Sequence, residues 1–92
     1  MRTIVKKKNS TKPERIVAET LKEMHVPFRH RVKIEGREID FVIGKYCLEI
    51  DGHDQAPDKN EQMVELGYVP IHLNNAEITK ERIVSLIKTI MV

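Results

Sequence analysis

Tryptophan is absent from this sequence of 92 residues, and aromatic residues make up only 4% of it. A surface that stacks nucleic-acid bases on aromatic rings is therefore not expected. The single cysteine, Cys47, cannot form an internal disulfide bond, and a lone thiol in an apolar segment usually behaves as a small hydrophobic residue. Long apolar runs are also missing, which argues against a membrane span and a secretory signal. We therefore expect a soluble, cytoplasmic protein.

The residues that are present fit one small domain. Hydrophobic residues account for 40% and charged residues for 33% of the chain. A chain this short buries a single core, which must here be built from Ile, Val, Leu and Met. We expect residues 11–92 to form this domain and residues 1–10 to form an arm that precedes it.

The arm is basic, whereas the rest of the chain is mildly acidic. The first twelve residues contain five basic side chains and no acidic one, and the other eighty contain 11 basic and 14 acidic side chains, a net charge of −3. Such an arm suits the phosphate backbone of DNA, but a solvated terminus explains it equally well. The basic residues are Arg2, Lys6, Lys7, Lys8 and Lys12.

Apolar periodicity and turn residues predict an α/β fold with the element order αβββαβα. In the second strand, Ile39, Phe41 and Ile43 alternate with polar or smaller residues. The last strand follows a helix, so it is expected to return parallel to its neighbour and to complete a mixed four-stranded sheet. The expected elements are a helix from Thr11 to near Val26, strands over 28–34, 37–43 and 46–51, a helix over 58–66, a strand over 68–73, and a helix capped by Thr79.

Acidic residues interrupt two strands that otherwise have an interior composition. Glu49 and Asp51 lie on one side of the third strand, and the tight turn before it brings Asp40 of the second strand close to them. Burying carboxylates is costly unless a positive charge neutralises them, and oxygen ligands at this density favour a hard cation such as Mg²⁺. The alternative is an edge strand with one face in water.

Two further residues extend this acidic group. His53 follows the third strand on a glycine-containing loop, where it can transfer protons near a metal. Glu14 shares a helical stripe with Val17 and Leu21, so its carboxylate faces the core. The alternative for Glu14 is a capping box that begins at Thr11.

Other polar residues near this group are ambiguous. Asp54 can bind a second metal or begin a turn, and Lys59 can meet a phosphate group or lie on a solvated helix face. His25, His30 and His72 have no acidic neighbours at ligand spacing in the sequence, so we interpret them as surface or packing residues.

Four segments together are similar to a known family of nucleases. They are Glu14 on the first helix, Asp40-Phe41-Val42, Glu49-Ile50-Asp51-Gly52-His53, and Leu66-Gly67-Tyr68. The combination resembles the very-short-patch-repair (Vsr-like) branch of the PD-(D/E)XK nucleases. It is also similar to the catalytic domain of phage-type homing endonucleases that carry an acidic-histidine, EDxHD-like site. The similarity covers nearly everything after the arm.

This resemblance implies a restriction-endonuclease-like core and an Mg²⁺-dependent or Mn²⁺-dependent endonuclease that hydrolyses double-stranded DNA in a bacterium or phage. Asp40 would be the central metal ligand, and Glu49 or Asp51 would complete the site. His53 would activate water or stabilise the scissile phosphate. Glu14 would orient His53 or a water at the metal, and Lys59 lies where related domains often carry a basic residue.

The sequence departs from the family pattern at one position. The pattern usually has a lysine two residues after the acidic ligand, and here Asp51 stands two residues after Glu49. An inactive DNA-binding module with the same fold is therefore one alternative, and a mismatch or structure-specific repair nuclease is another. A domain this small leaves little surface for reading a DNA sequence, so a separate recognition domain is expected. A double-strand cut would require two sites, which favours a homo-oligomer.

Overall fold

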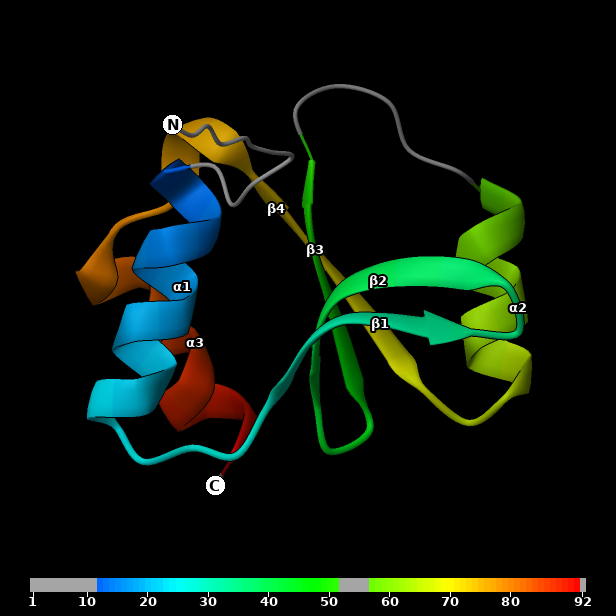
Figure 1. The fold of residues 1–92 in the computed structure, drawn as a ribbon, viewed down its shortest axis with the longest axis horizontal. Coiled ribbons are helices and arrows are strands. Elements are labelled where there is room, and N and C mark those ends of the chain that lie inside the picture. Colours follow the sequence, from blue (N-terminus) through cyan, green and yellow to red (C-terminus); the bar gives the residue numbers. More distant parts are fainter. Residues whose placement is uncertain (1–11, 52–56, 92) are drawn as a thin grey trace, which may run out of the picture.

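The computed structural model describes residues 12–51 and 57–91, and its elements follow the predicted order αβββαβα (Figure 1). The predicted ends of most elements lie within a few residues of the ends in the structure. Among the described residues, no helix is long and apolar enough to cross a membrane. The elements are α1 (Lys12–Glu23), β1 (Arg29–Ile34), β2 (Arg37–Ile43), β3 (Tyr46–Asp51), α2 (Pro57–Glu65), β4 (Val69–Asn74), a short 3₁₀ turn (Asn75–Glu77) and α3 (Lys80–Ile90).

The four strands form one mixed sheet in the order β1-β2-β3-β4. β1, β2 and β3 form an antiparallel meander, and β4 pairs with β3 in parallel, as predicted. The turn between β1 and β2 is tight because Glu35 and Gly36 have positive φ angles of 52° and 81°, which a two-residue hairpin turn favours. The parallel strand is reached through α2, which supplies the crossover that parallel pairing requires.

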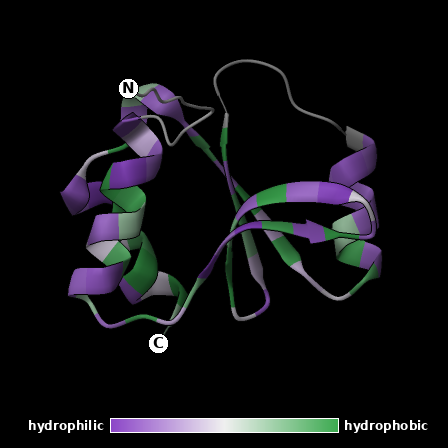
Figure 2. Cartoon of the chain, in the orientation of Figure 1, coloured by the Kyte–Doolittle hydropathy of each residue, from purple (hydrophilic) through white to green (hydrophobic). Residues whose placement is uncertain are grey.

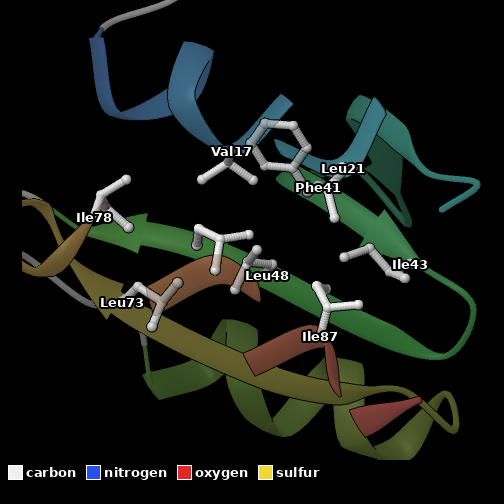
Figure 3. Packing of buried hydrophobic residues seen from close by; sticks show 9 residues of the cluster. Val17, Leu21, Phe41, Ile43, Leu48, Leu73, Ile78 and Ile87 are labelled. Carbon is white, nitrogen blue, oxygen red and sulfur yellow. The ribbon is translucent and has the colours of Figure 1, made fainter. Parts of the chain in front are cut away.

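The larger core lies between the sheet and the pair α1 and α3, which cover the same face (Figures 1 and 3). Val17 and Leu21 of α1 meet Phe41 of β2 there, and all three side chains are fully buried. Full burial of each such side chain stabilises the fold by about 2 kcal/mol.

Thr79 caps α3 by accepting a hydrogen bond from the Arg82 N–H at 3.1 Å, as predicted. The hydrophobic sides of the helices face inward (Figure 2).

A smaller core joins α2 to the opposite face of the sheet. Met63 of α2 packs there with Ile39, Val42 and Cys47. The alternation in the sequence predicted one face for Ile39, Phe41 and Ile43, and this is wrong for Ile39. The hairpin of β1 and β2 bends away from β3 toward α2, so Ile39 turns to the smaller core (Figure 1). Cys47 is buried as expected, and burial raises the pKa of its thiol.

Candidate active site

The hydrogen-bonded ladder between β2 and β3 stops where both strands carry acidic side chains. Its register ends with Phe41 opposite Leu48. At the next level the Asp40 N–H donates to Glu49 Oε2 at 3.0 Å, and the Ile50 N–H donates to Asp40 Oδ2 at 2.8 Å. Backbone N–H groups that leave a ladder inside a protein need other acceptors, and the two carboxylates supply them. We call this pair of acidic residues, Asp40 and Glu49, the acidic fork.

The negative charge of Asp40 is only partly compensated by the protein. The pKa of its carboxyl is raised above the ordinary value of 3.8, first because burial removes water from the charged form. The charges of Glu49 and Glu14 raise this pKa further. The hydrogen bond from the Ile50 N–H and the charge of Lys59 lower it, but they do not offset the other effects. An additional cation beside Asp40 would therefore be favourable.

Glu49 has a cationic partner on α2, which packs on the face of the sheet opposite to α1 and α3. The Lys59 Nζ of α2 lies 2.7 Å from Glu49 Oε1, and the two side chains are only 19% and 12% exposed. From the sequence, Lys59 was interpreted either as a phosphate contact or as part of a solvated helix face. The solvated helix face is wrong, because the Lys59 side chain is mostly buried. A lysine thus reaches the acidic fork, although not from the position two residues after the acid.

Glu14 is buried at the start of α1 and faces β1. Its carboxylate is 3.0 Å from Arg31 Nη2 and 3.8 Å from His30 Nε2, and only 7% of Glu14 is exposed. The expectation that Glu14 faces the core is confirmed. The alternative of a capping box stays untested, because Thr11 lies outside the described residues.

His30 and Arg31 were not among the predicted site residues. His30 packs on Phe41 with parallel rings whose centroids are 4.4 Å apart, as a packing histidine would. An acidic neighbour that the sequence spacing does not indicate approaches His30 from another element, because Glu14 Oε2 lies 3.8 Å from His30 Nε2. The buried His30 Nε2 has no hydrogen-bond partner among the described residues. A sequence signal existed, since His30 interrupts the alternating apolar residues Phe28, Val32 and Ile34.

The predicted site residues can now be located in part. Asp40 and Glu49 meet at the acidic fork, and the charge of Glu14 acts on Asp40. Lys12 is exposed at the first position of α1. Among the described side chains, no group of three or more His, Cys, Asp or Glu residues could hold a metal. The remaining predicted residues lie outside the described part of the chain, namely the side chain of Asp51 and all of His53, Asp54, Arg2, Lys6, Lys7 and Lys8.

The carboxylates of the acidic fork are suitable ligands for a hard divalent cation. Mg²⁺ is usually held by one or two carboxylates, and the rest of its shell comes from water and phosphate. Arg31 pairs with Glu14 and Lys59 pairs with Glu49, whereas no ion pair of Asp40 is found among the described residues. Of the carboxylates of Asp40, Glu49 and Glu14, that of Asp40 would therefore be stabilised most by a bound cation.

We expect Asp40→Asn to stabilise the metal-free protein at neutral pH. Asparagine keeps an oxygen for the Ile50 N–H but removes a charge whose burial is unfavourable. The pKa of Asp40 is raised in the folded state, so the wild type loses stability as pH rises from the ordinary value of 3.8 through the folded pKa, and the loss is complete above both. The difference in stability between the variant and the wild type is measured by thermal unfolding, followed by circular dichroism in a chelator, from acid to neutral pH. The advantage of the variant should vanish in acid, and an equally stable wild type at neutral pH would contradict the explanation.

The element order, the mixed sheet and the flanking helices match the fold of a nuclease catalytic domain. A comparison with solved structures finds the catalytic domain of the homing endonuclease I-Bth0305I, with a TM-score of 0.67 and 26% sequence identity. The match covers 89% of this chain and 92% of that domain. No protein-family model and no curated protein matches the chain.

Proposed function

We propose that the chain is the catalytic domain of a metal-dependent DNA endonuclease of the homing type. The observation that carries the proposal is the acidic fork of Asp40 and Glu49, in a fold that resembles a homing endonuclease catalytic domain. The four sequence segments that resemble Vsr-like nucleases with an EDxHD-like site support the same assignment.

In this proposal Asp40 and Glu49 hold Mg²⁺ or Mn²⁺, and Asp51 completes the ligand set. Such a cation, when bound, polarises a phosphate oxygen of DNA and favours hydrolysis of the phosphodiester bond. Lys59 keeps the Glu49 carboxylate in place and adds a positive charge for the scissile phosphate. Glu14 acts beside Asp40 from α1, and His53 moves protons.

The rest of the proposal concerns DNA and partners. The basic residues of the arm, with Lys12 at the start of α1, bind the phosphate backbone of double-stranded DNA, and Asp54 assists near the metal. Sequence recognition is left to a separate domain, and a second copy of the chain supplies the second site for a double-strand cut. Lys59 counts against the inactive-module alternative, because that alternative relied on a missing lysine.

A plasmid-nicking assay tests the proposal. We expect the purified chain to convert supercoiled plasmid to nicked or linear DNA with Mg²⁺ or Mn²⁺, and to do nothing in a chelator. Parallel reactions on mismatched and branched duplexes separate a homing enzyme from a repair nuclease, which would prefer those substrates. If the chain cleaves none of these DNAs with either metal but still binds DNA, the non-catalytic module is the better description.

A further inference from the structure

The backbone of Arg31 has an unusual conformation inside β1. Its φ angle is 57°, in the left-handed region that residues other than glycine rarely adopt. His25 and Glu35 also have positive φ, but His25 follows the end of α1 and Glu35 lies in a hairpin turn. Helix ends and tight turns commonly use this conformation. Arg31 lies within a strand, so neither explanation applies to it.

The unusual backbone conformation of Arg31 occurs where β1 packs against the Glu14 carboxylate. Consecutive side chains of a regular strand point to opposite faces. Here Arg31 Nη2 is 3.0 Å from one oxygen of Glu14, and His30 Nε2 is 3.8 Å from the other. The register between β1 and β2 also omits the pair that Arg31 would form with Asp40. The strand thus departs from regular geometry where two neighbouring residues approach one carboxylate.

An arginine occupies a backbone conformation that glycine would adopt more easily. Glycine would adopt the same backbone angle without strain, and the chain does use glycine in its turns, at Gly36 and Gly44. The pKa of Arg31 is raised, first by its hydrogen bond to Glu14 and next by the charge of Glu14, with smaller contributions from Glu38 and Asp40. The guanidinium is always charged, and it donates a hydrogen bond to the Glu14 carboxylate at 3.0 Å.

We infer that Arg31 is a positioning residue of the proposed active site, whose guanidinium holds the buried Glu14 carboxylate in the orientation in which Glu14 acts beside Asp40. The inference rests on the proposed nuclease function. A purely structural alternative is that the ion pair only fastens α1 to the sheet. The two differ because a fastening contact affects stability, whereas a positioning contact affects turnover through Glu14.

The deciding variant is Arg31→Gly, which permits the same backbone angle and removes the guanidinium. We expect kcat for plasmid nicking to fall about 10–100-fold, as is usual when a residue that orients an active-site carboxylate is lost. KM for DNA should stay close to the wild-type value, because Arg31 acts through Glu14. Circular dichroism checks that the variant is folded. Lys33→Gly is the matched control, since it makes the same change at an exposed position of β1 and should keep the wild-type kcat.

A double-mutant cycle shows whether Arg31 acts through Glu14. If it does, Arg31→Gly should cause no further loss of kcat in a Glu14→Gln background. Losses that simply multiply would overturn the inference. If Arg31→Gly does not fold, Arg31→Lys replaces it, because lysine keeps the charge without the planar guanidinium and should also lower kcat.

A binding measurement separates failure of this inference from failure of the proposed function. In the proposed site Glu14 orients a water at the metal, so releasing Glu14 from Arg31 should weaken Mn²⁺ affinity about tenfold or more in Arg31→Gly, measured by paramagnetic relaxation of water. A wild type that cleaves DNA beside an Arg31→Gly variant with equal kcat and Mn²⁺ affinity overturns the inference and leaves the function standing. If the wild type binds Mn²⁺ without cleaving, the affinity difference alone decides. If it neither cleaves nor binds Mn²⁺, the proposed site is wrong and the role of Arg31 is refuted with it.

Discussion

Asp40→Asn is expected to lower the rate of Mg²⁺-dependent plasmid nicking by on the order of 10³-fold. The substitution preserves the shape of the side chain and an acceptor for the Ile50 N–H, so the strands should keep their positions. It removes the charge that the neighbouring lysine and arginine leave least compensated. The expected combination is a protein that is more stable without metal and almost inactive with it.

The measurement is the initial rate of nicking at saturating Mg²⁺, with thermal unfolding of the same samples. Glu38→Gln is the control, because it also neutralises an acid of β2, at an exposed position opposite Lys33. Wild-type turnover by Asp40→Asn in the same buffer would remove Asp40 from the site. An equal loss in Glu38→Gln would point to a general effect of charge on DNA binding instead.

Much of this fold could be predicted from the sequence because its signals are local. Helical stripes, strand alternation and tight turns each depend on residues a few positions apart. The proximity of Asp40 and Glu49 was predictable for the same reason, since the short turn between β2 and β3 fixes their register. The parallel position of β4 followed from the need for a crossover through α2.

The details of the candidate site were less accessible because they depend on tertiary contacts. Lys59 meets Glu49 only because α2 packs across the sheet, and Glu14 meets β1 only because α1 packs on the other face. The left-handed conformation of Arg31 has no propensity signal, since arginine does not favour it. The bend that sends Ile39 to the smaller core breaks the alternation on which the strand prediction depended.

The position of Lys59 changes how the departure from the family pattern is interpreted. The expected lysine is replaced by Asp51, which suggested that the site has no lysine. In the structure the ammonium of Lys59 is 2.7 Å from the Glu49 carboxylate. A positive charge therefore reaches the acidic fork from a helix instead of from the strand. We propose that it takes over the electrostatic role of the missing residue, and this leads to the second prediction.

Lys59→Met should lower the nicking rate by about 10²-fold or more, because it removes a mostly buried positive charge beside Glu49, and the proposed function assigns that charge to stabilising the scissile phosphate. It should also destabilise the metal-free protein, since it leaves the Glu49 carboxylate buried without its cation. The two effects can be separated with the double variant Lys59→Met/Glu49→Gln. Neutralising both partners should recover much of the lost stability without recovering any nicking activity.

Thermal unfolding and nicking rates of the single and double variants provide this test, and Lys88→Met, at an exposed position of α3, serves as the control for loss of a lysine. Lys59→Arg should keep part of the activity, because it preserves the charge but changes the geometry of its hydrogen bonds. A Lys59→Met protein that is less stable yet nicks DNA at the wild-type rate would assign Lys59 to structure alone. The site would then have to stabilise the phosphate with residues other than this lysine.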